Sequence, residues 1–88
     1  MKKEALLTEL EQVAKDLGYA IRYEKGDFSG GSCVLNQQNL ILINKRVPIE
    51  AKLALLARAF AEFDLDSIFI KPVVREFIED EKARQKIK

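Results

Sequence analysis

Cys33 is the residue of this chain best suited to covalent chemistry, because a cysteine thiolate is an effective nucleophile. It follows the segment 30–32 (GGS), whose backbone N–H groups could stabilise an oxyanion. A cysteine nucleophile needs a base or a cation beside it. The chain has no histidine, so Arg22, Lys25 or a partner chain would have to substitute. Cys33 therefore either serves a small thiol-dependent enzyme or regulator, or is a buried strand cysteine acting as a small apolar residue, which the sequence favours.

Three carboxylates lie close together near position 64 and could bind a magnesium or calcium ion. They are Glu62, Asp64 and Asp66. The glycine and the closing glutamate of an EF-hand loop are missing, and a solvated helix terminus explains the cluster without an ion. The absence of histidine also removes the side chain that most often binds zinc. We therefore expect no metal and no cofactor, with these three carboxylates as the candidates if a metal is bound.

The segment 25–32 (KGDFSGGS) holds three of the four glycines and is typical of a loop. It contains neither the GxxxxGK[ST] nor the GxGxxG phosphate-binding pattern, and we expect a strand rather than a helix after it. Phe28 lies among its polar residues and is the candidate for an exposed aromatic. Phe28 would either anchor a partner or a second copy of the chain, or fold back over the edge of the core.

The charge of the chain gives no strong attraction to nucleic acid, since 15 basic and 14 acidic residues leave a formal net charge of +1. Basic residues do cluster near the C-terminus, but acidic residues precede them directly and no aromatics interleave for base stacking. They are Lys82, Arg84, Lys86 and Lys88, with Lys45 and Arg46 as a second small cluster. A charged surface explains both clusters, so we expect no nucleic-acid partner.

We also expect a cytoplasmic protein with no membrane partner. No apolar run approaches the ~20 residues that cross a bilayer. Charges interrupt the N-terminal apolar positions (MKKEALLTELEQ), unlike those of a signal peptide. The single cysteine cannot form an internal disulfide, which fits a reducing compartment.

Hydrophobic residues recur at helical spacing in two long segments. The first covers residues 3–17 and is followed by Gly18, which we expect to be its C-cap. The second covers residues 48–63, begins with a proline and carries one broad apolar face, so we expect it to be the core helix. A last helix is expected from Pro72. Its end, 79–88, is almost all charged, which predicts a solvated helix end.

Three further segments predict strands, namely residues 19–24, 33–35 and 40–44. The third contains the continuous apolar run Leu40–Ile43, which predicts that both faces are covered and that this strand is central. Ile68–Ile70 fit either a short strand or a helical turn. The fold class we predict is α+β, with a small antiparallel sheet of about three strands. The strands form a meander packed against helices, in the order α-β-β-β-α-α.

A chain of 88 residues supports one hydrophobic core, so we expect a single domain over 1–88. Its composition, 48% hydrophobic and 33% charged, is close to a globular average. A domain this small buries only roughly 60–65% of its unfolded surface. Self-association would bury more, and we therefore expect a homo-oligomer, with a dimer as the simplest case.

Three sequence features resemble those of a small family of short bacterial proteins with no assigned activity. They are GGxC at residues 30–33, NKRxP at 44–48 and PxxRE at 72–76. The resemblance covers residues 30–79 and implies nothing about chemistry. The chain is also faintly similar to the minimal zincin-like metalloprotease core, in which an N-terminal helix and a few strands precede a helix bearing HExxH. The matching residues, 58–62 (RAFAE), lack both histidines and the general-base glutamate, so this resemblance implies a scaffold without its metal site.

These features together predict a non-enzymatic protein-interaction or regulatory module that binds another protein or its own copy. The alternative is the thiol-dependent enzyme or regulator using Cys33. A third and weaker hypothesis is an accessory to nucleic acid, whose binding would weaken steeply with added salt.

Overall fold

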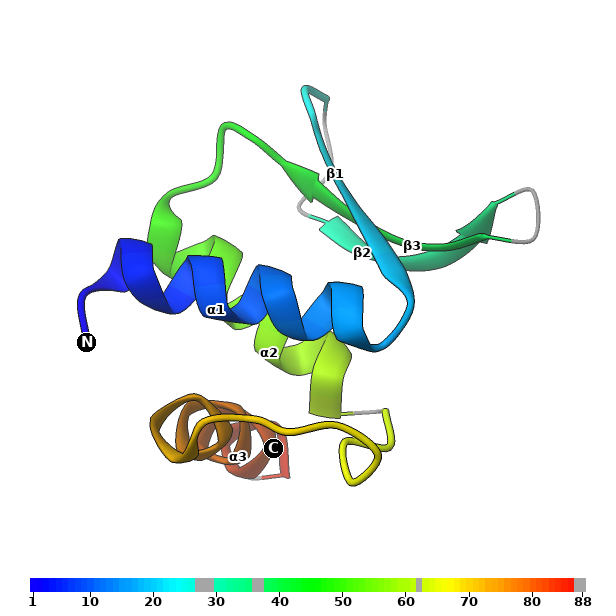
Figure 1. Ribbon diagram of the computed structural model, residues 1–88. Coiled ribbons are helices and arrows are strands. Elements are labelled where there is room, and N and C mark those ends of the chain that lie inside the picture. The colour runs from blue at the N-terminus through cyan, green and yellow to red at the C-terminus, as the bar shows by residue number, and fades with distance from the viewer. Residues whose placement is uncertain (27–29, 36–37, 62, 87–88) are drawn as a thin grey trace.

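The computed structural model describes residues 1–26, 30–35, 38–61 and 63–86, and for residues 30–35, 38, 85 and 86 it describes the backbone alone. The described residues form three helices and three strands, which follow one another along the chain as α1-β1-β2-β3-α2-α3 (Figure 1). Their bounds are α1 Lys3–Asp16, β1 Tyr19–Glu24, β2 Gly30–Leu35, β3 Gln38–Asn44, α2 Ile49–Ala61 and α3 Pro72–Lys86.

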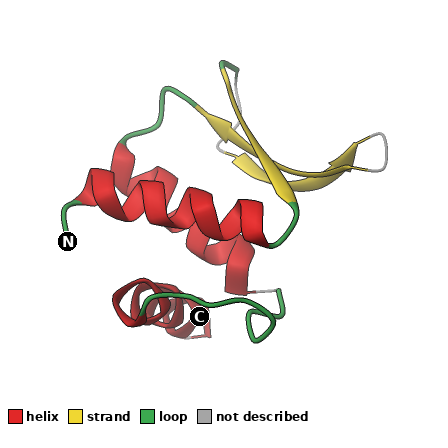
Figure 2. Cartoon of the chain, viewed as in Figure 1, coloured by secondary structure: helices red, strands yellow, loops and turns green. Residues whose placement is uncertain are grey.

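The α+β class is confirmed, because the helices pack together and carry the sheet on one side. α1 packs against β1, and α2 packs against β2 and β3. Figure 2 shows the strands gathered at one end of the molecule, with α3 on the opposite side of α1 and α2. Within the described residues α3 contacts α1 and α2 but no strand. The molecule therefore has three layers: the sheet, the α1–α2 pair and α3.

The predicted antiparallel meander is wrong, because the sheet is mixed. Its strand order is β1-β3-β2, with β1 parallel and β2 antiparallel to β3. The prediction assumed that strands adjacent in sequence pair with each other. The apolar run of β3 overrides that assumption, since the middle position buries it most. Leu40, Ile41 and Ile43 are buried, as a central strand requires.

Two local predictions also need correction. The loop predicted over 25–32 ends earlier, because Gly30 and Gly31 already pair with Ile43 and Leu42 of β3. Ile68–Ile70 are neither strand nor helix: the Ile68 N–H donates to the Leu65 carbonyl at 3.5 Å and closes a turn, and Phe69 and Ile70 follow it as irregular backbone.

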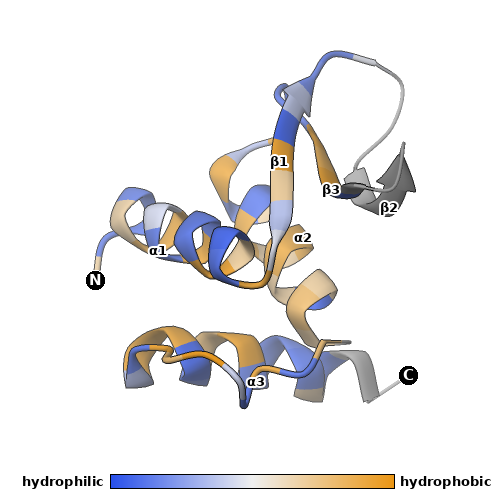
Figure 3. Ribbon diagram, turned by 45° about the vertical axis from the view of Figure 1, so that its right-hand side comes forward, coloured by the Kyte–Doolittle hydropathy of each residue, from blue (hydrophilic) through white to orange (hydrophobic). Residues whose placement is uncertain are grey.

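The core lies where the three layers meet. Its fully buried large side chains are Leu10, Ile41, Ile43, Leu56, Phe60, Val74 and Ile78. Figure 3 shows β3 and α2 as largely hydrophobic, whereas α1 and α3 carry hydrophilic residues as well. Gly18 ends α1 with a φ of 85°, a left-handed conformation that favours glycine and confirms its predicted capping role. Within the described residues no helix has the length and apolarity that crossing a membrane requires.

The predicted solvated end of α3 is wrong at Glu81, which is only 4% exposed. Arg58 of α2 reaches this carboxylate, and its Nε lies 3.0 Å from Glu81 Oε1. A charged residue enters the interior here because a cation from another helix pairs with it.

Candidate functional site

The candidate residues from the sequence lie in different parts of the chain. Cys33 is in β2, an edge strand, opposite Leu40 of β3. Its side chain is outside the described part of the structure, so its role as a nucleophile stays a prediction. Phe28 and Glu62 lie outside the described residues altogether.

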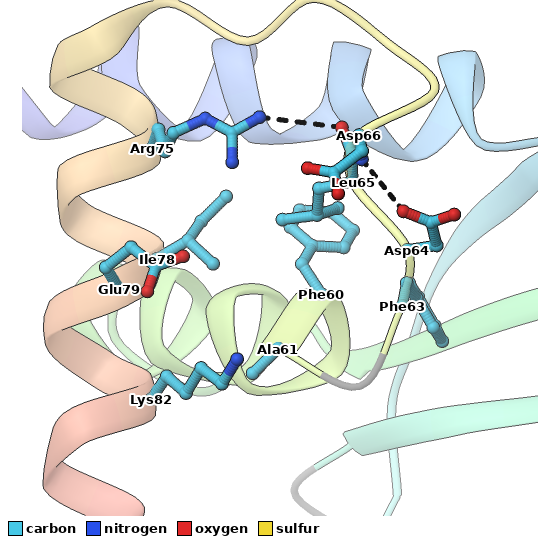
Figure 4. Close-up of a pocket in the computed structure, with 10 residues that line it drawn as sticks. All are labelled: Phe60, Ala61, Phe63, Asp64, Leu65, Asp66, Arg75, Ile78, Glu79 and Lys82. Atoms are coloured by element: carbon cyan, nitrogen blue, oxygen red, sulfur yellow. Dashed lines mark hydrogen bonds between the residues drawn. The ribbon is translucent and has the colours of Figure 1, made fainter.

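Asp64 and Asp66 border a polar pocket between the end of α2 and α3 (Figure 4). The Asp66 N–H donates to Asp64 Oδ1 at 3.0 Å, which fixes the turn that carries both carboxylates. The pocket has a volume of about 170 Å³. Its charged lining also includes Arg75, Glu79 and Lys82 from α3.

The pocket is lined by charges of both signs, three carboxylates and two cations. The amine of Lys82 points into the pocket from α3, and Arg75 Nη2 donates to the Leu65 carbonyl at 3.5 Å (Figure 4). Two cations thus accompany the carboxylates, and Asp64 already accepts a backbone hydrogen bond. The described residues contain no group of three or more side chains that could hold a metal ion. Since Glu62 is not among them, the predicted three-carboxylate site stays a prediction.

The predicted basic cluster is divided among different contacts. Lys82 lines the polar pocket, whereas Arg84 Nη1 lies 3.5 Å from Glu81 Oε2. Arg58 completes this group from α2, so Glu81 joins the two helices. Lys88 and the side chain of Lys86 are outside the described part of the chain. Of the described members, Lys82 therefore borders the α2–α3 pocket and Arg84 pairs within α3, and the absence of a nucleic-acid partner stays a prediction.

A larger and more apolar groove of about 520 Å³ follows β1, the strand at the other edge of the sheet. It is lined by Glu11 and Lys15 of α1 and by Tyr19, Ala20, Ile21 and Tyr23 of β1. We call this the β1 groove. At one end the Tyr19 ring stacks on Phe63, with 4.6 Å between ring centroids. The floor of the groove is thus fixed by contacts with the core.

The other end of the β1 groove holds a tyrosine that is tied to both neighbouring helices. The Tyr23 hydroxyl donates to the Glu11 carboxylate, and Lys52 Nζ lies 5.5 Å from the ring centroid. Burial raises the pKa of the Tyr23 hydroxyl far above its ordinary value of 10.0, and the hydrogen bond and charge of Glu11 raise it further. Tyr23 is therefore neutral near neutral pH and acts as a hydrogen-bond donor, not as a base.

A third feature is an exposed apolar surface at the start of α3. Phe69 is 80% exposed and Val73 is 47% exposed. Phe77 follows one turn later and packs partly against the core. We call Phe69, Val73 and Phe77 the Phe69 surface. A groove of about 200 Å³ lies beside it, between α1 and the segment 69–74.

The sequence reasoning missed Phe69 and selected Phe28 as the exposed aromatic. The alternation of Ile68–Ile70 was the available signal, since a buried Ile70 turns its neighbour outward. The segment before α3 is neither helix nor strand, so the hydrophobic periodicity of a regular element did not indicate which of its residues are exposed.

Comparisons of the chain with protein-family models, with curated proteins and with solved structures find no match. Membership in a family of short bacterial proteins therefore stays a prediction, as does the kinship with a zincin-like core. The surfaces described above are what supports a functional proposal.

Proposed function

We propose that this chain is a non-enzymatic protein-interaction module of the cytoplasm, and that its docking site is the Phe69 surface. The observation that carries the proposal is the 80% exposure of Phe69 beside the 47% exposure of Val73. A fully formed loop and helix hold these apolar side chains in water. The two residues lie four positions apart in the sequence, and exposed apolar patches mark protein-binding surfaces.

The groove next to Phe69 suggests how a partner engages. Its walls include Val13 of α1 and Val74 of α3, and its volume is about 200 Å³. Lys71 and Glu9 also line it and pair with each other, with 2.8 Å between Nζ and Oε1. A space of this size accepts one apolar side chain of a partner, and Phe69 is among the residues that line it.

The charges around the Phe69 surface favour a partner with basic residues at its rim. Glu76 and Asp80 are exposed and share the helix face of Val73, three and seven residues further on. Asp16 lines the groove from α1. Lys71 is already paired with Glu9, so the rim has an acidic surplus. We therefore propose a protein partner that inserts one apolar side chain and presents lysine or arginine to this rim.

A binding role is further supported by the hydrogen bonds and ion pairs that the polar side chains lining the grooves and the pocket already make. Asp64 accepts from a backbone N–H, Tyr23 donates to Glu11, and Glu9 pairs with Lys71. Groups held in such contacts are suited to stabilising the fold and the surface shape. A binding module requires only this structural role of its polar side chains.

The test is a quantitative pull-down from lysate of the source organism, read by mass spectrometry, with wild-type protein beside Phe69→Ser. A partner that uses the Phe69 surface should be recovered in stoichiometric amount by the wild type. Its recovery should fall at least about tenfold with Phe69→Ser, as for a residue at the centre of an interface. Val73→Ser should weaken the same partner to a smaller extent.

Two controls make the result specific. Lys45→Ser changes an exposed residue beyond β3, away from α3, and should retain the partner. Cys33→Ser should also retain it, whereas the thiol-dependent alternative requires its loss. A partner recovered equally by wild type and Phe69→Ser, or lost with Cys33→Ser, would contradict the proposal.

A further inference from the structure

β1 lies at the edge of the sheet with a side that no described strand pairs. β3 occupies one side of β1 over the whole register from Tyr19–Asn39 to Glu24–Asn44. An edge strand presents unpaired N–H and C=O groups, and natural proteins cover such edges or pair them with another strand. Along β1 the structure has the β1 groove in that place, with a volume of about 520 Å³.

The β1 groove is lined mainly by apolar and aromatic side chains, which favours its burial against a partner. Tyr19, Ile21 and Tyr23 are half-buried, lie on the helix side of the sheet and pack partly against the core. α1 contributes only Glu11 and Lys15, from consecutive helical turns. An occupant must therefore satisfy a strand edge, cover apolar side chains and meet one acidic and one basic group.

We propose that the occupant is β1 of a second copy of this chain, which pairs antiparallel with β1 about a two-fold axis through Ile21. The two three-stranded sheets then form one continuous sheet of six strands. A second copy presents the same edge groups and the same groove, which a two-fold interface requires. This assembly does not rest on the proposed function at the Phe69 surface.

The register follows from keeping both helix layers on the same side of the joined sheet. Residues directly opposite each other then share a face, so the axis passes through a residue of β1. An axis at Ile21 places Ile21 opposite its own copy and Tyr19 opposite Tyr23 of the partner subunit. An axis at Arg22 would instead place two arginines opposite each other, which is unfavourable.

The charges of α1 complement themselves in this arrangement. Glu11 is held at the Tyr23 end of the groove by its hydrogen bond, and Lys15 lies one helical turn closer to the start of β1. Because the axis brings the Tyr19 end of one subunit to the Tyr23 end of the other, each Glu11 faces Lys15 of the partner subunit. Two symmetric pairs of opposite charge thus border the interface, and they specify the second copy over an unrelated strand.

The arrangement leaves the other surfaces available. α3 lies on the side of the helices away from the sheet (Figures 1 and 2). A dimer through β1 therefore carries two Phe69 surfaces at its periphery, and a bivalent partner would gain from both.

The first experiment measures the mass of the purified full chain over a concentration series, by light scattering or sedimentation. We expect twice the chain mass of 10.0 kDa. Lys15→Glu places two carboxylates at each charged contact and should raise the dissociation constant about tenfold or more. Lys2→Glu makes the same charge change at the opposite end of α1 and should leave the dimer intact. A monomer at all concentrations, or a dimer indifferent to Lys15→Glu, would overturn the proposal.

The second experiment tests the register in a Cys33→Ser background. Ile21→Cys puts two thiols opposite each other on the axis, within the range that a disulfide spans. Mild oxidation should therefore yield a covalent dimer. Ala20→Cys is the matched control, because Ala20 is more exposed but is opposite Arg22 of the partner subunit. Faster cross-linking at Ala20 than at Ile21 would sink this register even if the mass is that of a dimer.

Discussion

The contact between α2 and α3 is closed around Glu81, whereas the contact between α1 and β1 is open along one side. Each has a carboxylate that bridges two elements: Glu81 binds Arg58 across the helix pair, and Glu11 accepts from Tyr23 across the helix–strand pair. Glu81 is only 4% exposed. Glu11 is half-buried and borders a groove of about 520 Å³.

This difference between the two contacts indicates that one serves the stability of the fold and the other serves association with a partner. A charge without access to water must be paired inside the fold, so the closed contact holds the helices in place. The open contact leaves apolar side chains and a strand edge unfilled, and these have most to gain from a partner. We therefore expect substitutions at the closed contact to lower the free energy of unfolding, and substitutions at the open contact to weaken dimerisation.

Phe60→Ala should give the largest effect, because this side chain is fully buried at the closed contact. Truncation removes apolar burial and leaves a cavity, at about 3–5 kcal/mol of the free energy of unfolding. Urea denaturation followed by circular dichroism measures it. Ile21→Ala, half-buried at the open contact, should cost about 1–2 kcal/mol in the monomer. Equal losses for the two variants would remove the distinction between the contacts.

Arg58→Met tests the ion pair at the closed contact. The Arg58 side chain is 58% exposed, so water solvates it readily when Glu81 is changed. Glu81, in contrast, is buried and has no such access to water when Arg58 is changed. Without Arg58 the buried carboxylate retains, among the described residues, Arg84 at 3.5 Å, and we expect the free energy of unfolding to fall by about 1–3 kcal/mol.

Glu81→Gln is the matched change and should cost less than Arg58→Met, since it removes the buried charge itself. The same denaturation experiment orders the two variants. Should Glu81→Gln prove the more damaging, the energy of this contact would reside in the carboxylate's hydrogen bonds and not in the pairing of a buried charge.

The same contrast explains what the sequence could predict. The helices were predicted from hydrophobic periodicity and β3 from a continuous apolar run, and both signals are local, within 15 residues or so. The burial of Glu81 was missed because its partner Arg58 is 23 residues away, and no local pattern announces such a pair. The parallel pairing of β1 depends on competition among three strands for the central position, which is likewise non-local.

The candidate sites were harder to predict than the fold. Residue type selected Cys33 and the carboxylates near Asp64, yet reactivity and metal binding depend on neighbours that only folding assembles. The exposure of Phe69 follows from a turn preceding α3, not from a periodic element. The β1 groove requires β1 to lie at an edge, and the predicted meander made β1 an edge strand next to the wrong neighbour.

Tyr23→Phe probes the polar link at the open contact. It removes one hydrogen bond to Glu11 and should lower the free energy of unfolding by about 0.5–1.5 kcal/mol near pH 7. The raised pKa of the hydroxyl gives a pH signature. The stabilisation is fully present below the ordinary pKa of 10.0 and is lost as the pH rises toward the folded value. The stability difference between wild type and Tyr23→Phe should therefore narrow above pH 10, and a constant difference would contradict the link.

The smallest effect is expected at an exposed ion pair that belongs to neither contact. Lys3 Nζ lies 2.6 Å from Glu50 Oε2, between the first turns of α1 and α2, with both side chains more than half exposed. The hydrogen bond from Lys3 lowers the pKa of Glu50 below its ordinary value of 4.5, and the bond to Glu50 raises the pKa of Lys3 above 10.5. The contribution of Glu50 is thus present above pH 4.5 and is lost as the pH falls through its folded pKa. That of Lys3 is present below pH 10.5 and is lost as the pH rises through its folded pKa. Carboxyl titration by NMR should show the Glu50 pKa returning toward 4.5 in Lys3→Ala and in about 1 M salt, with little change in the free energy of unfolding.

Two outcomes would contradict this view of the Lys3–Glu50 pair. If Lys3→Ala leaves the Glu50 pKa unchanged, the lowering of that pKa comes from the backbone of α2. If Lys3→Ala lowers the free energy of unfolding as much as Arg58→Met does, exposure does not set the energy of these ion pairs.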